Sequence, residues 1–204
     1  MNISLKPGHL VRYKQILTLF LRYLNSDVAK EMKHADFMTE DELAKIEAKG
    51  RPEQLADDLE KMGPTFVKVG QLLSSRADLL PEAYLKGLAR LQDKVKPFPY
   101  EDVERIVNDE LGVRVSKAFE TFDPEPLAAA SLGQVHRATL RDRREVVVKV
   151  QRPGIRKQCA EDFEVLEEMA AFFDSHTKIG RRYQFTKVLD EFKTTLKHEL
   201  DYRE

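Results

Sequence analysis

The sequence of 204 residues has one cysteine, Cys159, and almost no net charge. One cysteine excludes an internal disulfide and a cysteine-based zinc site, and it fits a reducing, cytoplasmic setting. Lys and Arg number 34 against 35 Asp and Glu, so no global field favours nucleic acid. No segment approaches the roughly 18 uninterrupted apolar residues of a membrane-spanning helix, and the N-terminus lacks the apolar core of a signal peptide.

What the chain does contain is helical periodicity. Hydrophobic residues make up 42% of it and charged residues 34%, which is typical of a soluble, helix-rich protein. Proline at a first helical turn and glycine just after a last one mark several boundaries. The spacing of apolar residues predicts helices over 11–24, 52–62, 64–80, 81–91, 100–111, 155–176 and 184–204, a short helix near 40–48, and turns at 116–122 and 178–182.

One region, 127–152, is instead typical of strands. It starts with small residues, alternates through 134–140, and after a charged turn continues in the valine-rich run 146–150. Lys149 lies inside that run, where its ammonium needs either an anionic partner or access to solvent. Two interpretations follow: Lys149 is on the wet face of an antiparallel strand, or it is the strand lysine that protein kinases place against nucleotide phosphates and a helix glutamate.

Two further groups are candidates for a site. Lys68 and Gln71 are three residues apart and share a helix face, while Gly70 leaves bare backbone that another group could approach. Their bland interpretation is a solvated helix face. Glu199 and Asp201 are two apart, so on a helix they face nearly opposite ways and each needs its own partner. The bland alternative pairs Glu199 with Arg203 at the surface.

The helix predicted at 11–24 is amphipathic, with Ile16, Leu17 and Leu21 on one face. Its cationic flanks allow two interpretations, because such a face either docks on the rest of the protein or lies on a membrane surface.

The order of these signals along the chain resembles the ABC1/UbiB family of atypical protein-kinase-like proteins, also called AarF or ADCK-type. The resemblance covers 63–204 closely and the first sixty residues loosely. Its motifs are Lys68-x-Gly70-Gln71 and the runs SSRADLLP (74–81), LQDKV (91–95), PLAAASLGQVH (126–136), VKVQRPG (148–154) and ELDYRE (199–204).

The resemblance implies a role for each matching residue. Lys68, Gly70 and Gln71 match the KxGQ motif, whose helix covers the nucleotide site, and Glu199 with Asp201 match the ExD motif. Lys149 matches the strand lysine that contacts phosphates. The family's alanine-rich loop, which replaces a glycine-rich one, corresponds to Ala128, Ala129, Ala130 and Ser131.

The family further implies that the chain binds ATP or ADP with Mg²⁺ and has weak ATPase-type phosphoryl chemistry. It implies support of ubiquinone, quinone or lipid biosynthesis at a membrane, with a lipid or quinone precursor as ligand and a location in the cytoplasm or peripheral to the inner membrane. Phosphorylation of proteins is not expected. Here a positive charge on Lys68 near the transferring phosphate, held by Glu199 or Asp201, is chemically reasonable.

The sequence departs from a complete kinase. It has no H-R-D-type aspartate and no D-F-G, so the C-lobe is expected to be absent and the metal ligands to lie beyond Glu204, with no metal ligand in this chain. The predicted fold is therefore α+β and mostly helical: an N-terminal helical extension packed on a partial kinase-like N-lobe of about three antiparallel strands and long helices. The expected domains are 1–50, a helix and linker; 51–122, the KxGQ extension; and 123–204, the partial N-lobe.

On its own this chain is expected to bind nucleotide poorly and to catalyse nothing. The rival interpretation is a non-catalytic helical scaffold that binds a membrane or a partner through 11–24. Nucleic-acid binding is disfavoured, because the basic residues near the strands have little aromatic interleaving and acidic residues follow at once.

Overall fold

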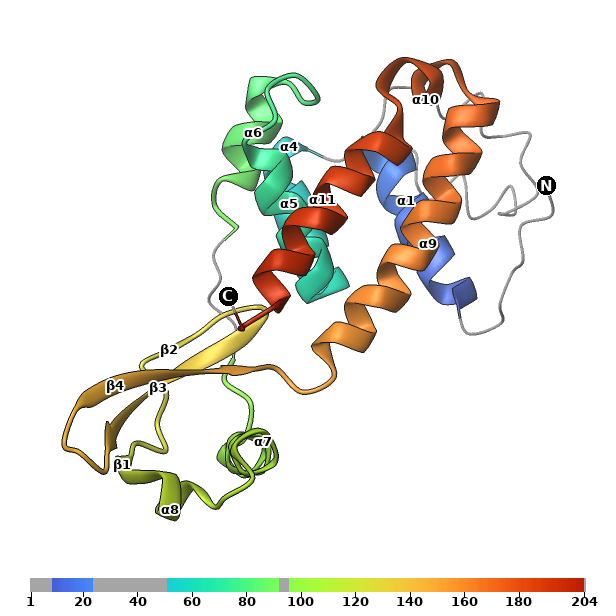
Figure 1. Cartoon of the computed structure of the whole chain (residues 1–204). Coiled ribbons are helices and arrows are strands. Elements are labelled where there is room, and N and C mark those ends of the chain that lie inside the picture. Colours follow the sequence, from blue (N-terminus) through green and yellow to red (C-terminus); the bar gives the residue numbers. More distant parts are fainter. Residues whose placement is uncertain (1–8, 24–50, 92–95, 204) are drawn as a thin grey trace. The chain divides into compact units, whose positions relative to one another are not determined.

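The computed structural model describes residues 9–23, 51–91 and 96–203, which fall into two compact units (Figure 1). The helical unit comprises Met1–Leu91 and Gln158–Glu204, and the sheet unit comprises Gln92–Lys157. The helix predicted near 40–48 lies outside the described residues. The α+β, mostly helical fold class is confirmed.

Prolines and glycines divide the first half of the helical unit as the sequence predicts. Pro52 and Pro64 each stand at a first helical position, where the missing N–H would have no intrahelical partner. Gly63 separates those two helices at φ 102°, a conformation that favours glycine. The helices among the described residues of this unit are α1 (Leu10–Tyr23), α4 (Pro52–Met62), α5 (Pro64–Ser74), α6 (Glu82–Leu88), α9 (Ile155–His176, which begins in the sheet unit), α10 (Lys178–Tyr183) and α11 (Phe185–Leu200).

The apolar face of α1 is buried inside the helical unit. Ile16 is fully buried in a cluster with residues of α4, α5, α6 and α9, including Leu59 and Phe66, and Leu17 packs in a second cluster with Phe173 of α9. Of the two interpretations of this amphipathic helix, the structure agrees with docking on the rest of the protein. None of the helices in the described ranges combines the length and apolar content needed to cross a membrane.

Ion pairs hold both ends of α1. Arg12 bonds Asp162 of α9 at 2.6 Å, and Arg22 bonds Asp58 of α4 at 2.6 Å. Burial raises the pKa of Asp58, but hydrogen bonds from Tyr23, Arg22 and Lys61 outweigh it and bring the pKa below the ordinary value of 3.8. The charged form of Asp58 therefore stabilises the folded helical unit.

The sheet unit is a small antiparallel sheet covered by a helix. Its elements are α7 (Tyr100–Leu111), α8 (Val115–Ala118), β1 (Phe119–Phe122), β2 (Ala128–Ala129), β3 (Gly133–Leu140) and β4 (Glu145–Gln151). The long strand β3 pairs with β1 and β2 along one edge and with β4 along the other. Val103 and Val107 of α7 pack with Phe119, Ala138 and Val150 to form the core.

Several boundaries differ from the sequence predictions. The helix predicted over 64–80 ends at Ser74, and α6 begins only at Glu82. The turn predicted at 116–122 is α8 followed by β1, and the basic turn at 178–182 is the helix α10. Thr177 caps α10 by accepting a hydrogen bond from the Gly180 N–H at 2.9 Å. The last helix ends at Leu200, so Asp201 lies beyond it with extended backbone (φ −95°, ψ 103°).

Candidate functional site

Lys68 and Glu199 form an ion pair within the helical unit. Lys68 is in α5 and Glu199 is in the last turn of α11, and Nζ lies 2.9 Å from Oε2. The Lys68 side chain is 13% exposed, so its amine is held largely out of water beside the carboxylate. Two motifs that are far apart in the sequence thus meet here, and the solvated-face interpretation of Lys68 is wrong.

The two carboxylates of the ExD motif have different partners because α11 ends between them. Glu199 is still helical and points to α5, whereas Asp201 follows the last helical residue and accepts two hydrogen bonds from Arg203, at 2.8 and 2.6 Å. The alternative pairing of Glu199 with Arg203 is therefore wrong, because Arg203 bonds Asp201. The opposite-face argument assumed one continuous helix, which the structure does not have.

Gly70 and Gln71 have local packing roles in the same unit. A Cβ on Gly70 would lie 2.4 Å from Leu91 Cδ1 and 2.8 Å from Leu59 Cδ1, so the bare backbone admits leucine side chains. The Gln71 amide donates to the Leu91 carbonyl over a long 3.5 Å. Both residues join α5 to the chain that follows α6.

The alanine-rich segment of the sheet unit is part strand and part tight turn. Ala128 and Ala129 form β2 and pair with Val135 and Gln134. The Ala130 N–H then donates to the Gly133 carbonyl at 2.8 Å, which closes the turn 130–133. Ser131 within that turn is fully buried.

Arg152 holds this turn, and sequence reasoning gave it no role. Its guanidinium donates to the carbonyls of Ser131 (3.2 Å), Ala130 (3.3 Å) and Lys96 (3.1 Å), and it lies 5.4 Å from the centroid of the Phe98 ring. Burial lowers the pKa of Arg152. The VQRPG run was a visible signal, but nothing local showed that its arginine reaches back to the alanine-rich turn.

A buried polar chain lies beneath the same turn. Gln134 accepts from the Phe98 N–H at 2.9 Å and donates to the Phe98 carbonyl at 3.3 Å and to His136 Nε2 at 3.0 Å. Since Nε2 accepts there, Nδ1 carries the proton and donates to the Asp123 carbonyl at 2.8 Å. Both side chains are almost fully buried, so the turn rests on a saturated hydrogen-bond network.

Lys149 lies in β4 opposite Val135 and is exposed. It shares its strand face with Glu145 and Val147, which are also exposed. This is the wet-face placement among the two interpretations of the valine-rich run. An exposed amine at this position is free of the desolvation cost that a fully buried lysine would carry.

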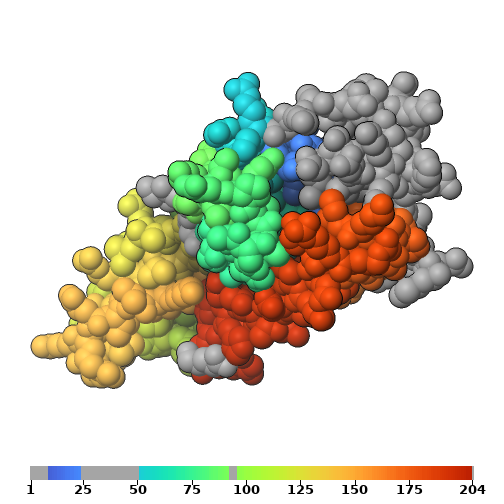
Figure 2. Space-filling model, turned by 90° about the horizontal axis from the view of Figure 1, so that it is seen from above, coloured from blue at the N-terminus to red at the C-terminus, as the bar shows by residue number. Residues whose placement is uncertain are grey.

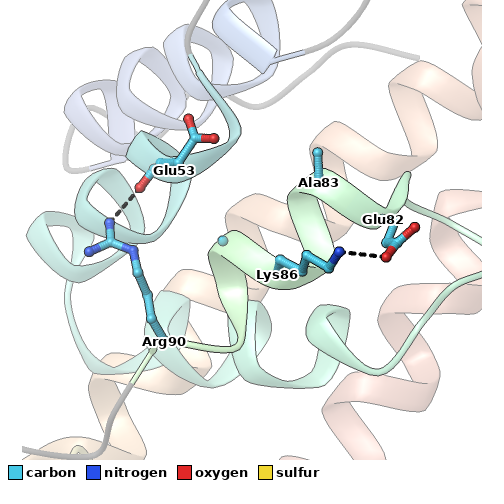
Figure 3. Close-up of a pocket in the computed structure, with 6 residues that line it drawn as sticks. Glu53, Glu82, Ala83, Lys86 and Arg90 are labelled. Carbon is cyan, nitrogen blue, oxygen red and sulfur yellow. Dashed lines mark hydrogen bonds and ion pairs between the residues drawn. The ribbon is translucent and has the colours of Figure 1, made fainter.

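A surface depression of about 480 Å³ lies between α4 and α6, and none of its lining residues is a predicted site residue (Figure 3). Its cations are already neutralised, since Lys86 pairs with Glu82 at 2.6 Å and Arg90 bonds Asp57 at 2.7 Å and the Glu53 carbonyl at 2.5 Å. We assign it no ligand. Among the described residues there is also no group of three His, Cys, Asp or Glu side chains placed to hold a metal ion.

The sequence matches a known protein family. A family model of the ABC1 atypical kinase-like domain matches residues 90–204, more than half of the chain. The chain belongs to the ABC1 atypical kinase-like family. The resemblance inferred from the motifs is thereby confirmed.

Individual relatives with long sequence matches support this family assignment. An uncharacterized protein from Synechocystis, sll1770, is 42% identical over 98% of this chain and 34% of its own length. A probable protein kinase UbiB from Cellvibrio japonicus is 45% identical over 74% of this chain and 27% of its own length. The chain therefore spans about a third of the length of the curated relatives it matches.

A solved structure of Mycobacterium tuberculosis Rv3197 in complex with erythromycin is 32% identical. It covers 74% of this chain and 38% of that chain with a TM-score of 0.44.

Proposed function

We propose that this chain supplies part of the nucleotide site of a UbiB-type protein, which binds ATP or ADP and supports quinone or lipid biosynthesis at a membrane. In this proposal Lys68, Gln71, Lys149, Glu199 and Asp201 serve the phosphoryl chemistry, and Ala128, Ala129, Ala130 and Ser131 form the loop over the phosphates. The observation that carries the proposal is the ion pair between Lys68 and Glu199.

The pair supports the proposal because of how it is built. A lysine that only stabilised two helices would serve equally well at the surface, where an ion pair contributes about 0–1 kcal/mol. Lys68 is instead mostly enclosed, and Glu199 fixes where its charge is held. A fixed cation of this kind stabilises charge on a transferring phosphoryl group at no cost of reorganisation.

The sheet unit supports the proposal independently. Backbone amides of a short turn can cradle phosphate oxygens when the turn is rigid. Arg152 and Gln134 supply that rigidity for the turn 130–133, and Lys149 is an exposed cation on the last strand.

Mg²⁺ is the cofactor that the family implies, and the described residues do not make a site for it. Glu199 is paired with Lys68 and Asp201 with Arg203, and no third ligand joins either carboxylate. We therefore derive no step through the metal. For the whole protein we propose, from the family resemblance of its motifs, a lipid or quinone precursor as ligand and a cytoplasmic location peripheral to the membrane.

A chimaera tests the proposal. The matched 151 residues of this chain replace their counterparts in the Cellvibrio japonicus UbiB, and melting temperature is measured with and without Mg-ADP. At about 100 times Kd a ligand stabilises the folded state by about 2.7 kcal/mol. We expect the chimaera to be stabilised, and Lys149→Ala and Lys68→Ala to lose most of that stabilisation.

Arg144→Gln is the matched control, because it removes an exposed cation from the turn just before β4. The guanidinium of Arg144 pairs with Asp142, two residues away in the same turn. This variant should keep the full nucleotide response. If the unaltered Cellvibrio protein responds to nucleotide while the chimaera and all its variants do not, the chain is a scaffold and the proposal fails.

A further inference from the structure

A second ion pair joins the same two helices that Lys68 and Glu199 join. Arg76 follows the end of α5, and its Nη1 lies 2.7 Å from Oε2 of Glu191 in α11. Residues 68 and 76 are eight apart in sequence, and so are 191 and 199. Because the order is reversed, the two segments run antiparallel, with one ion pair near each end of their contact. The helices α5 and α11 are in contact, and in the space-filling view the green surface that includes α6 borders the red surface of α11 (Figure 2).

Arg76 is well prepared to act as a fixed point. Its Nε and Nη2 donate to the two carboxylate oxygens of Asp78, both at 2.8 Å, so the guanidinium plane is set before it reaches Glu191. Its own backbone is also held, since the carbonyl accepts from Leu79 and Leu80 and the N–H donates to the Leu73 carbonyl. The hydrogen bonds that Arg76 donates to Asp78 and then to Glu191 raise the pKa of Arg76.

The helix that receives Arg76 is equally fixed. Lys193 of α11 pairs with Glu167 of α9, and Asp174 of α9 accepts the first N–H groups of α11 from Phe185 (2.8 Å) and Thr186 (3.0 Å). With α11 held on α9, α5 is attached at two points about 12 Å apart along α11, at 1.5 Å per residue. Core packing through residues such as Phe66 already holds α5 in the helical unit, and the two ion pairs fix its register along α11.

We propose that Arg76 is a positioning residue, which, through Glu191, sets the register of α5 on α11 and so keeps the Lys68 amine on Glu199. The motif run 74–81 thereby acquires a role: Asp78 orients the guanidinium, and the guanidinium reaches the helix that carries the carboxylate motif. The value of this arrangement to phosphoryl chemistry rests on the proposed function. The arrangement itself needs no nucleotide.

Amine labelling of the 204-residue chain tests the proposal without nucleotide. The chain is treated briefly with isotope-coded acetic anhydride, and the acetylation rate of each lysine is measured by peptide mass spectrometry. Lys68, at 13% exposure, should label slowly in the native chain, and Lys86, at 76% exposure, is the internal reference. We expect Arg76→Gln and Glu191→Gln to raise the ratio of the Lys68 rate to the Lys86 rate by about 2- to 5-fold, which corresponds to the upper range of an exposed ion pair.

Further variants separate positioning from general loosening. Glu199→Gln removes the direct partner and should give the largest increase, and adding Arg76→Gln to it should add nothing, because both act through the same contact. Asp57→Asn is the control, since it breaks the exposed pair with Arg90, at 2.7 Å, in the same unit and should leave the ratio unchanged.

The outcomes are decisive in both directions. An unchanged ratio in Glu191→Gln, which leaves the Arg76–Asp78 fork intact, overturns the proposal, as does an additive increase in the double variant. If Arg76→Gln makes every lysine label faster, unfolding is the cause for that variant and Glu191→Gln decides alone. If the labelling ratio rises as expected but nucleotide does not stabilise the chimaera, the positioning role of Arg76 stands and the nucleotide site is rejected.

Discussion

Replacing Gln134 by leucine should destabilise the sheet unit far more than the same change at Gln71. Leucine has a similar volume, so the change removes hydrogen bonds with little loss of packing. Three buried groups would lose their partner: the Phe98 N–H, the Phe98 carbonyl and His136 Nε2. Gln134 is only 1% exposed, so water cannot replace it without rearrangement.

The magnitude follows from those three groups. A buried donor or acceptor left without a partner costs about 1–3 kcal/mol. The bond to the Phe98 carbonyl is long, at 3.3 Å, and the apolar side chain regains some free energy by burial. We therefore expect Gln134→Leu to lower the free energy of unfolding by about 3–5 kcal/mol. Gln71 makes one long bond of 3.5 Å in a half-buried position, so Gln71→Leu should cost less than about 1 kcal/mol.

Urea unfolding followed by far-ultraviolet circular dichroism measures both variants, and hydrogen exchange of the Phe98 amide locates the effect. The Phe98 amide should exchange at least tenfold faster in Gln134→Leu and unchanged in Gln71→Leu. A loss below about 1 kcal/mol in Gln134→Leu, with the Phe98 amide still protected, would refute the reasoning that this network supports the turn 130–133.

The remaining predictions concern single contacts. Arg152→Lys keeps the charge but cannot reach three carbonyls at once, so amides of the turn 130–133 should exchange several-fold faster in mass-spectrometric hydrogen exchange. Gly180→Ala would place a Cβ 2.0 Å from the Phe173 carbonyl oxygen, a backbone clash that should lower unfolding free energy by about 2 kcal/mol in urea. Since the folded-state pKa of Asp58 is depressed, its stabilisation is present above pH 3.8 and lost as pH falls through that pKa, so Asp58→Asn should show a flatter acid limb in thermal melts from pH 5 to pH 2.

The sequence predicted those elements whose limits are set locally. Proline at positions 52 and 64 starts α4 and α5, and Gly112 ends α7 in the left-handed conformation, φ 67°. Each of these signals acts within one helical turn of the residue that carries it. The helices they delimit accordingly begin or end where the pattern predicts.

Of the two elements that were missed, β1 depends on residues distant in sequence and α10 on nearby ones. The strand β1 is short and is recognisable only through its pairing with the far end of β3, where Phe119 lies opposite Leu140. The helix α10 forms in a basic run because Gly180 packs against the Phe173 carbonyl and Thr177 caps its first turn. The pairing of β1 is not visible in a window of local sequence. Thr177, by contrast, is a local helix-start signal directly before α10, and the basic run was nevertheless predicted as a turn.

The candidate site was also predicted only in part from the sequence. Motif order led to the expectation that Glu199 or Asp201 holds Lys68, and Glu199 does so at 2.9 Å. The choice between the two carboxylates could not be predicted, because the helix end that turns Asp201 away could not be foreseen. Arg152 was missed although its run was noted. Its three acceptors are carbonyls, and a backbone acceptor leaves no trace in the sequence.

The structure gives two residues of the KxGQ motif a packing role. Gly70 is required by leucine side chains that fill the space of its missing Cβ, and Gln71 contributes a weak bond to a backbone carbonyl. Both roles hold α5 in place and need no ligand. Lys68 is different, because its mostly enclosed ammonium is held 2.9 Å from the carboxylate of Glu199. A methionine of similar length would pack there without the desolvation cost of a charge, so the charge of Lys68 is the part of the motif on which the proposed nucleotide site depends.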